Sequence, residues 1–338
     1  MTLELAAGLA LALMAAVLQG TFLLPMASAR NWRWEHNWAV FSLFAMLLFN
    51  WAIAITLLPN LIPVYRSVPV RELLMVMMFG AAWGAGAVLF GLAVDKLGLA
   101  LGYPIIMGLN ASLGAVIPLV FLVQRDASAA KVITVVAGTV IALGGIVVCS
   151  VAGSRKESRQ SAQPAGRTAF TAGLMIAVAS GILCGLPNVG MVYAVNIVKA
   201  AKRAGAPDAL AGNAVWALFF TLGAIVNVGY CVWLMVRRRN VRELFGPDGA
   251  RNLALGSLTA LMWIGSFYLY GIGAPLFGNW GAVIGWPVFI SVAIGVGCLA
   301  GLWKGEWKRA PASALGLLRN GLLLILAAVI TLAAANTL

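Results

Sequence analysis

The sequence predicts an all-α membrane protein with ten transmembrane helices, arranged as two inverted five-helix repeats. Its 338 residues are 62% hydrophobic and only 10% charged, with a mean hydropathy of +0.97, whereas soluble domains carry about 25% charged residues. Apolar runs of about 20 residues, long enough to cross a bilayer as a helix, recur along the whole chain. These observations exclude a soluble fold.

Ten such apolar runs can be drawn. Helices are expected in each, because a helix satisfies its own backbone hydrogen bonds inside lipid. The first run ends in Met26-Ala27-Ser28-Ala29, which resembles a signal-peptide cleavage site, but no Lys or Arg precedes it, so a span is expected instead. The expected spans are residues 4–27, 38–58, 72–94, 98–123, 130–152, 169–198, 209–236, 252–275, 280–303 and 315–336.

The distribution of basic residues predicts the orientation of the chain. Sixteen of the 23 Lys and Arg lie in or beside the loops after the odd-numbered spans, and the other seven follow even-numbered spans. Because basic loops stay in the cytoplasm, both termini are expected on the periplasmic side of a bacterial inner membrane. Membrane anchoring therefore accounts for the formal net charge of +13, and no nucleic-acid partner is predicted.

A polar loop at residues 154–168 divides the chain into two halves of five spans each, residues 1–153 and 169–338. The loop is expected in the cytoplasm, because it is among the most basic segments of the chain. Since five is an odd number, a unit repeated in the two halves must be inverted in the membrane.

The two halves carry matching residues at corresponding positions. Trp83 in the third span corresponds to Trp263 in the eighth. Gly102-Tyr103-Pro104 in the fourth span corresponds to Gly285-Trp286-Pro287 in the ninth. Paired hydrophobic helices interrupted by Gly and Pro are typical of the substrate site of a secondary transporter. A chance alignment of common membrane residues is the alternative, and it explains the Trp and Pro matches poorly.

The sequence carries no motif for enzymatic chemistry. It has one histidine, His36, which is expected at the membrane interface, and four cysteines that lie singly inside apolar runs as small buried side chains. It contains no H-E-x-x-H motif and no phosphate-binding glycine loop. We therefore predict neither an enzyme nor a bound cofactor or metal ion.

The ionisable candidates are two acids beside spans. Glu35 and Asp95 could couple transport to protons if they reach the substrate pathway. A solvated position at the end of a helix is the expectation for both, because burial of a carboxylate in a membrane is costly.

The candidate substrate-binding residues are neutral. A sugar offers an apolar ring face and several hydroxyl groups, which aromatic rings and amides can bind without charge. The alternative roles are interface anchoring for the rings and helix–helix hydrogen bonding for the amides. The candidates are Trp83, Tyr103, Asn110, Asn188, Trp263, Tyr268 and Trp286, and Pro104, Pro187 and Pro287 are the expected hinges.

Several stretches of the sequence are similar to the L-rhamnose–proton symporter family, within the drug/metabolite transporter superfamily. They are Trp32-Arg33-Trp34-Glu35, Trp51-Ala52-Ile53, Leu57-Leu58-Pro59-Asn60, Phe79-Gly80-Ala81-Ala82-Trp83-Gly84, Leu261-Met262-Trp263 and Glu306-Trp307. They fall in both halves of the chain and in the family's order. The resemblance implies a ten-helix inner-membrane carrier that imports L-rhamnose or a related deoxy sugar with protons by alternating access.

Two other functions compete with this interpretation. The third and eighth spans carry few polar side chains and no deep carboxylate, which favours an uncoupled or exporting carrier for a more apolar small molecule. A sensor or structural membrane protein is the other alternative, but a static bundle has no use for paired, interrupted helices. The bilayer, a sugar and protons are therefore the expected partners, and the sequence makes no prediction of oligomeric state.

Overall fold

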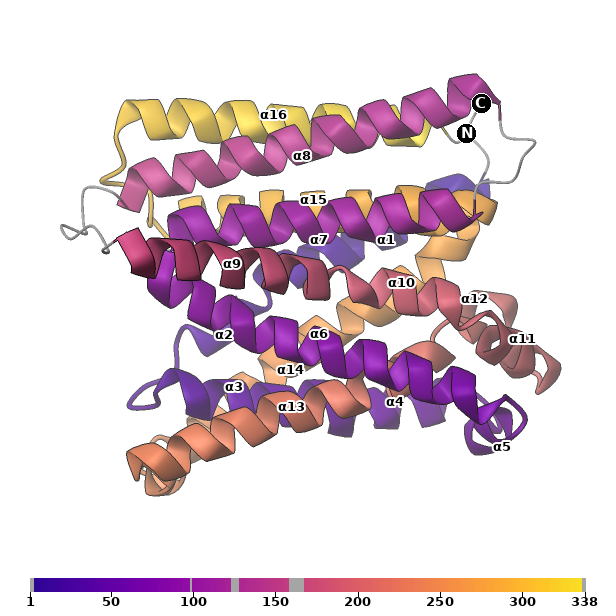
Figure 1. The fold of residues 1–338 in the computed structure, drawn as a ribbon, viewed down its shortest axis with the longest axis horizontal. Coiled ribbons are helices and arrows are strands. Elements are labelled where there is room, and N and C mark those ends of the chain that lie inside the picture. Colours follow the sequence, from indigo (N-terminus) through magenta and orange to yellow (C-terminus); the bar gives the residue numbers. More distant parts are fainter. Residues whose placement is uncertain (1–2, 98, 123–127, 158–166, 336–338) are drawn as a thin grey trace. The chain divides into compact units, whose positions relative to one another are not determined.

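The computed structural model describes residues 3–97, 99–122, 128–157 and 167–335, and every regular element in these residues is a helix (Figure 1). The elements are α1 (Leu3–Thr21), α2 (Leu23–Met26), α3 (Trp34–Ser42), the π-helical turn η1 (Leu43–Leu48), α4 (Phe49–Leu57), α5 (Leu61–Arg66), α6 (Val70–Leu97), α7 (Leu99–Leu122), α8 (Ala129–Glu157), α9 (Arg167–Cys184), α10 (Leu186–Tyr193), α11 (Val195–Arg203), α12 (Asp208–Ala211), α13 (Ala214–Arg238), the 3-10 helix η2 (Val241–Phe245), α14 (Gly249–Gly273), the 3-10 helix η3 (Ala274–Trp280), α15 (Gly281–Trp303) and α16 (Ala312–Ala335).

Within the described residues, nine helical segments are long and apolar enough to cross a membrane. The chain is therefore an all-helical, multi-pass membrane protein, as the composition predicts. The remaining predicted span, residues 98–123, corresponds to α7, whose described apolar stretch runs over Ile105–Gly114.

The chain forms two compact units, and each draws helices from both sides of the 158–166 stretch. Unit 1 comprises Met1–Gly20, Gly86–Val189 and Gly273–Leu338, and unit 2 comprises Thr21–Ala85 and Gly190–Ile272.

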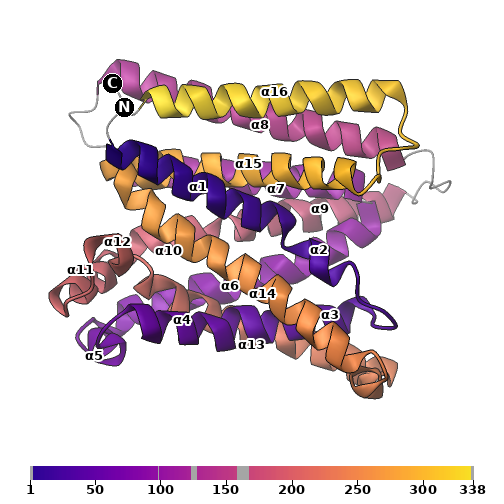
Figure 2. The same cartoon turned by 180° about the vertical axis from the view of Figure 1, so that it is seen from behind.

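In unit 1, α8 and α16 lie side by side and run in opposite directions (Figure 1 and Figure 2). Gly138 of α8 meets Leu332 of α16, whereas Gly145, further along α8, meets the earlier residues Ile325 and Gly321. A Cβ atom added to Gly145 would lie 3.0 Å from the Ile325 backbone nitrogen and 3.1 Å from the Gly321 carbonyl oxygen. Glycine at these positions therefore lets the two backbones approach closely.

The rest of unit 1 packs through α7, which contacts α8, α9 and α15. Gly181 of α9 faces Leu109 of α7, and Gly20 at the end of α1 faces the backbone of Ala293 in α15. Small residues again mark the close crossings between helices.

In unit 2, α13 contacts α3, η1 and α4. The π-helical turn η1 interrupts the ordinary hydrogen-bonding pattern of the second span, and the Asn50 amide just after it donates to the Met46 carbonyl at 3.1 Å. A side chain thus supplies a hydrogen bond to a carbonyl group within the irregular turn.

Three cysteines (Cys149, Cys184 and Cys231) are buried free thiols, as expected of small apolar side chains, and Cys298 is half-buried. His36 differs from its predicted interfacial position. It is fully buried in unit 2, where Nε2 lies 3.0 Å from the Asn240 carbonyl oxygen.

Candidate functional site

The two corresponding tryptophans of the sequence meet in unit 2. The Trp83 ring of α6 stacks on the Trp263 ring of α14, with ring centroids 5.5 Å apart and an interplanar angle of 29°. Both side chains are buried, and each stands near the middle of its span. Phe220 of α13 completes the contact, with its centroid 5.1 Å from that of Trp83 and 4.9 Å from that of Trp263.

Further rings extend this contact into an aromatic cluster drawn from α3, α6, α13 and α14. Edge-to-face arrangements dominate it, and such arrangements stabilise aromatic pairs beyond their buried area. The cluster consists of Phe41, Trp83, Trp216, Phe219, Phe220, Trp263 and Phe267.

Glycines on α6 position the Trp83 ring. Gly80 and Gly84 stand one turn apart on the face of α6 that meets α13. A Cβ on Gly84 would lie 2.7 Å from the Gly223 Cα, and one on Gly80 would overlap the Phe219 carbonyl. The two backbones are therefore in direct contact, and this close packing places Trp83 against Phe220.

Amides cross-link the helices around the cluster. The Asn227 carboxamide donates to the Gly84 carbonyl at 3.2 Å and accepts a hydrogen bond from the Trp38 indole at 2.9 Å. The Asn50 carboxamide donates to the Trp216 carbonyl, and its oxygen accepts from the Tyr268 hydroxyl at 2.9 Å. These groups are thus hydrogen-bonded within the protein.

Three candidates gather in unit 1 around Gly114 of α7. The indole of Trp286 from α15 covers Gly114 so closely that a Cβ there would overlap Nε1. The Asn188 amide from α10 donates to the Gly114 carbonyl oxygen. Asn110 stands one turn before Gly114 on α7, and a Cβ added to Gly185 would lie 3.5 Å from the Asn110 carbonyl oxygen.

Asn110 differs in its hydrogen bonding from Asn50, Asn188 and Asn227. Its side chain is buried, and its Nδ2 atom has only a 4.0 Å contact with the Met107 sulfur. Among the described residues, its Oδ1 atom has no hydrogen-bond partner. An unsatisfied buried oxygen is costly, so Asn110 is the amide in unit 1 best suited to accept a hydrogen bond from a ligand.

Glu35 does not occupy the solvated position that the sequence predicts. Its side chain is fully buried in unit 2, and its carboxylate accepts hydrogen bonds from Arg238 at 3.0 and 3.1 Å and from the Asn240 amide at 2.8 Å. The expectation failed because a cation and an amide from the end of α13 compensate the buried charge.

For some of the other predicted residues, the structure describes the backbone but not the side chain. The side chains of Tyr103, Pro104 and Asp95 are among those that the structure does not describe. The backbone of α7 is helical through residue 104, and α15 is helical through Pro287. The sixth predicted span is interrupted at Gly185, two residues before Pro187.

Two hydrogen-bonding residues were not predicted. Asn50 is an amide inside an apolar run, which is itself a sequence signal for a hydrogen bond between helices. Glu72, in the first turn of α6, accepts hydrogen bonds from the backbone nitrogens of Asn196 and Ile197 and so caps the start of α11. No sequence signal links Glu72 to residues more than 100 positions away.

Comparison with known proteins places these observations in a family. The family model described as L-rhamnose-proton symport protein (RhaT) matches residues 1–336. The chain is 29% identical over 320 residues to an L-rhamnose-proton symporter of Klebsiella pneumoniae (strain 342), with 91% of each chain covered. Symporters of the same name from Cronobacter sakazakii and Escherichia coli are 29% and 28% identical over the same coverage. The chain is a membrane transporter, not an enzyme, and it belongs to the L-rhamnose-proton symport protein family.

Proposed function

We propose that this protein imports L-rhamnose or a related deoxy sugar together with protons, by alternating access. The observation that carries the proposal is the stacked pair Trp83–Trp263 in a chain whose family match runs over residues 1–336. Relatives that are 29% identical to it over 320 residues are named L-rhamnose-proton symporters.

The chemistry of the candidate residues suits a deoxy sugar. Such a sugar presents C–H groups on its ring and a methyl group, and both pack well on indole faces. Its hydroxyl groups need acceptors and donors, of which the unsatisfied Oδ1 of Asn110 is one. We therefore assign Trp83, Trp263 and Asn110 to the substrate, with Tyr103, Asn188, Tyr268 and Trp286 as further candidates.

Two inverted five-helix repeats, residues 1–153 and 169–338 with the linker 154–168 between them, would provide the alternating access. Corresponding helices that pack together must run in opposite directions in such a fold. The antiparallel pair α8 and α16, the fifth helix of each half, fits this requirement. The contact between the corresponding residues Trp83 and Trp263 supports it as well.

In this proposal both termini lie in the periplasm, because the most basic loops stay in the cytoplasm. Pro104, Pro187 and Pro287 act as hinges. Glu35 and Asp95 remain the candidates for proton coupling. The Glu35 carboxylate is buried and pairs with Arg238, whose side chain is half exposed.

An uncoupled or exporting carrier for a more apolar small molecule is the second candidate. One observation favours it: the amides of Asn50, Asn188 and Asn227 all hydrogen-bond to the protein. Few side-chain amides among the described residues near the candidates are then left for a sugar.

Transport in liposomes separates the two candidates. Purified protein is reconstituted, and uptake of radiolabelled L-rhamnose is measured with an inward proton gradient, without one, and after a protonophore. L-Mannose, which differs from L-rhamnose by one hydroxyl group on C6, is the competing sugar. We expect that the proton gradient drives L-rhamnose uptake and that L-mannose inhibits this uptake only weakly.

Liposomes without protein, and liposomes with Trp83→Phe protein, are the matched controls. The Trp83→Phe variant keeps an aromatic face and should retain part of the uptake. Absence of L-rhamnose uptake in all conditions rejects the sugar, and uptake that ignores the gradient rejects coupling.

A further inference from the structure

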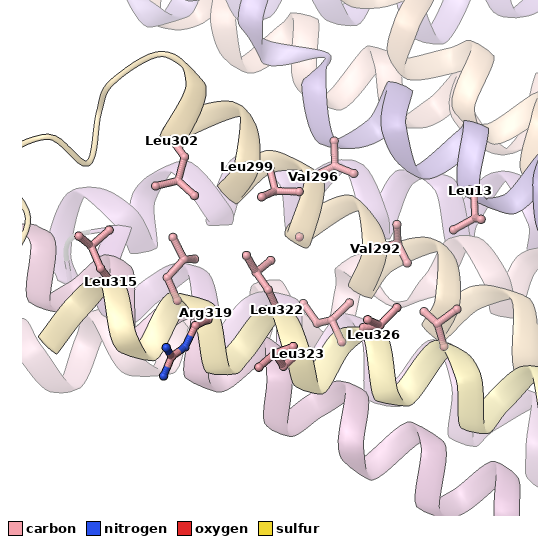
Figure 3. Close-up of a pocket in the computed structure, with 14 residues that line it drawn as sticks. Leu13, Val292, Val296, Leu299, Leu302, Leu315, Arg319, Leu322, Leu323 and Leu326 are labelled. Atoms are coloured by element: carbon pink, nitrogen blue, oxygen red, sulfur yellow. The ribbon is translucent and has the colours of Figure 1, made fainter. Parts of the chain in front are cut away.

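An apolar groove runs along the surface of unit 1 between α15 and α16, with α1 at one end. Its volume is about 630 Å³, and of its 14 lining residues only Arg319 is charged or polar. Figure 3 shows Leu299 and Leu302 of α15 facing Leu315 and Leu322 of α16 across it. A groove of this composition suits a hydrocarbon chain, and both flanking helices are long and apolar enough to be membrane spans.

Arg319 stands at the edge of the groove, inside a transmembrane helix. Its side chain is exposed, and in the part of the chain that the structure describes it makes no ion pair. In Figure 3 its guanidinium group turns away from the leucines. An exposed cation within a membrane-spanning helix is costly unless it reaches the headgroup region or meets an anion.

The stretch of the groove between Arg319 and Val329 matches one lipid chain in length, and the groove continues one turn beyond Arg319 to Leu315. Arg319 and Val329, at the far end, are ten residues apart on α16. Ten residues span about 15 Å of helix at 1.5 Å per residue, which equals half of the roughly 30 Å hydrocarbon core. A headgroup at Arg319 therefore leaves an acyl chain long enough to fill the groove to Val329.

The turn beside this end of the groove is basic. It lies between Trp303, where α15 ends, and Ala312, where α16 begins. Its Lys304, Lys308 and Arg309 are exposed, and its one acid, Glu306, pairs with Lys156 at 3.4 Å. A basic patch at the end of an apolar groove complements a lipid with an anionic headgroup.

We propose that this groove binds one anionic phospholipid, with its phosphate at Arg319 and one acyl chain between α15 and α16. Phosphate and guanidinium form paired, charge-assisted hydrogen bonds. The acyl chain of the lipid would fill the groove between α15 and α16.

Native mass spectrometry of the purified protein tests this proposal. Phosphatidylglycerol and phosphatidylcholine with identical acyl chains are titrated against the wild type, Arg319→Gln and Arg319→Lys. The wild type should bind phosphatidylglycerol more tightly than phosphatidylcholine. Arg319→Gln should weaken phosphatidylglycerol binding about fivefold, and Arg319→Lys should restore most of it.

Two sets of control variants test whether lipid binding depends on this groove and not on surface charge or side-chain size in general. Arg242→Gln removes an exposed arginine from η2 in unit 2 and should leave lipid binding unchanged. Leu299→Trp fills the groove and should reduce binding, whereas Ile330→Trp changes an exposed residue of α16 outside the groove and should not.

Three results would overturn the proposal. They are equal affinity of the wild type for both lipids, equal loss in Arg319→Gln and Arg242→Gln, and unchanged binding in Leu299→Trp. A stable dimer that forms in detergent and is lost in Leu299→Trp would instead assign the groove to a second copy of the chain.

Discussion

Asn110 and Asn188 carry the same side chain in the same unit but differ in what their amides do. The Asn188 amide donates to the Gly114 carbonyl, whereas the Asn110 oxygen has no partner among the described residues. Loss of a buried hydrogen bond costs stability, and loss of an unsatisfied polar atom does not. We therefore expect Asn188 to stabilise the fold and Asn110 to be available to a ligand.

We expect Asn110→Ala to raise the apparent KM for sugar uptake several-fold and to leave the thermal midpoint of unfolding unchanged. Asn188→Ala should lower stability by about 1 kcal/mol. Uptake in liposomes and melting in detergent measure the two effects. An Asn110→Ala protein that melts early but transports with normal KM would assign Asn110 to the fold.

Glu35 and Arg238 form the second residue-scale test. A buried pair costs about 3–5 kcal/mol when one partner is removed, but the Arg238 side chain is 46% exposed, so a smaller loss is expected. Glu35→Gln and Arg238→Gln should each destabilise the protein, and the double variant should lose less than the sum. A coupling energy of at least about 0.5 kcal/mol marks residues in contact.

Transport by the same variants tests the role of Glu35 in coupling. If its carboxylate carries the proton, Glu35→Gln should exchange sugar across the membrane at equilibrium but should not accumulate it with a proton gradient. Arg238→Gln should retain some accumulation, because the carboxylate remains. Gradient-driven accumulation by Glu35→Gln would place coupling elsewhere.

At the scale of helices, adjacent glycines on α8 provide a matched comparison. A Cβ on Gly145 would press on Ile325 and Gly321 of α16, whereas one on Gly144 would meet nothing within 4 Å. Gly145→Ala should therefore cost about 1–3 kcal/mol through overpacking. Gly144→Ala should be neutral or stabilising, because alanine restricts the unfolded chain more than glycine does.

Thermal unfolding in detergent compares the two variants. An equal shift in both would show that helix propensity, and not the contact between α8 and α16, controls stability at this position.

The helices could be predicted from the sequence because length and hydropathy alone limit what can cross a bilayer. Trp83 and Trp263 could be singled out by their matching positions, but the contact between their rings could not be predicted. The partners of Glu35 could not be predicted, because Arg238 and Asn240 lie more than 200 residues away. The free-energy cost of burying a carboxylate predicts that a single acid stays exposed to water. That prediction fails where a cation from a distant part of the sequence compensates the charge.

At the scale of the whole molecule, the proposed topology fixes the side of the membrane on which each turn lies. It puts the turn around η2, after the seventh predicted span, in the cytoplasm and the turn after α11 in the periplasm. Phe245, the last residue of η2, and Arg203, the last residue of α11, are both exposed. Cysteines at these positions can therefore report the location of each turn.

In intact cells, a membrane-impermeant maleimide should label Arg203→Cys and leave Phe245→Cys unlabelled until the membrane is opened. The chain's own cysteines are replaced by alanine first, since Cys298 is only half-buried. Labelling of Phe245→Cys alone in intact cells would invert the topology. Labelling of both cysteines in intact cells would place the two turns on the same side of the membrane, which requires an even number of spans between them.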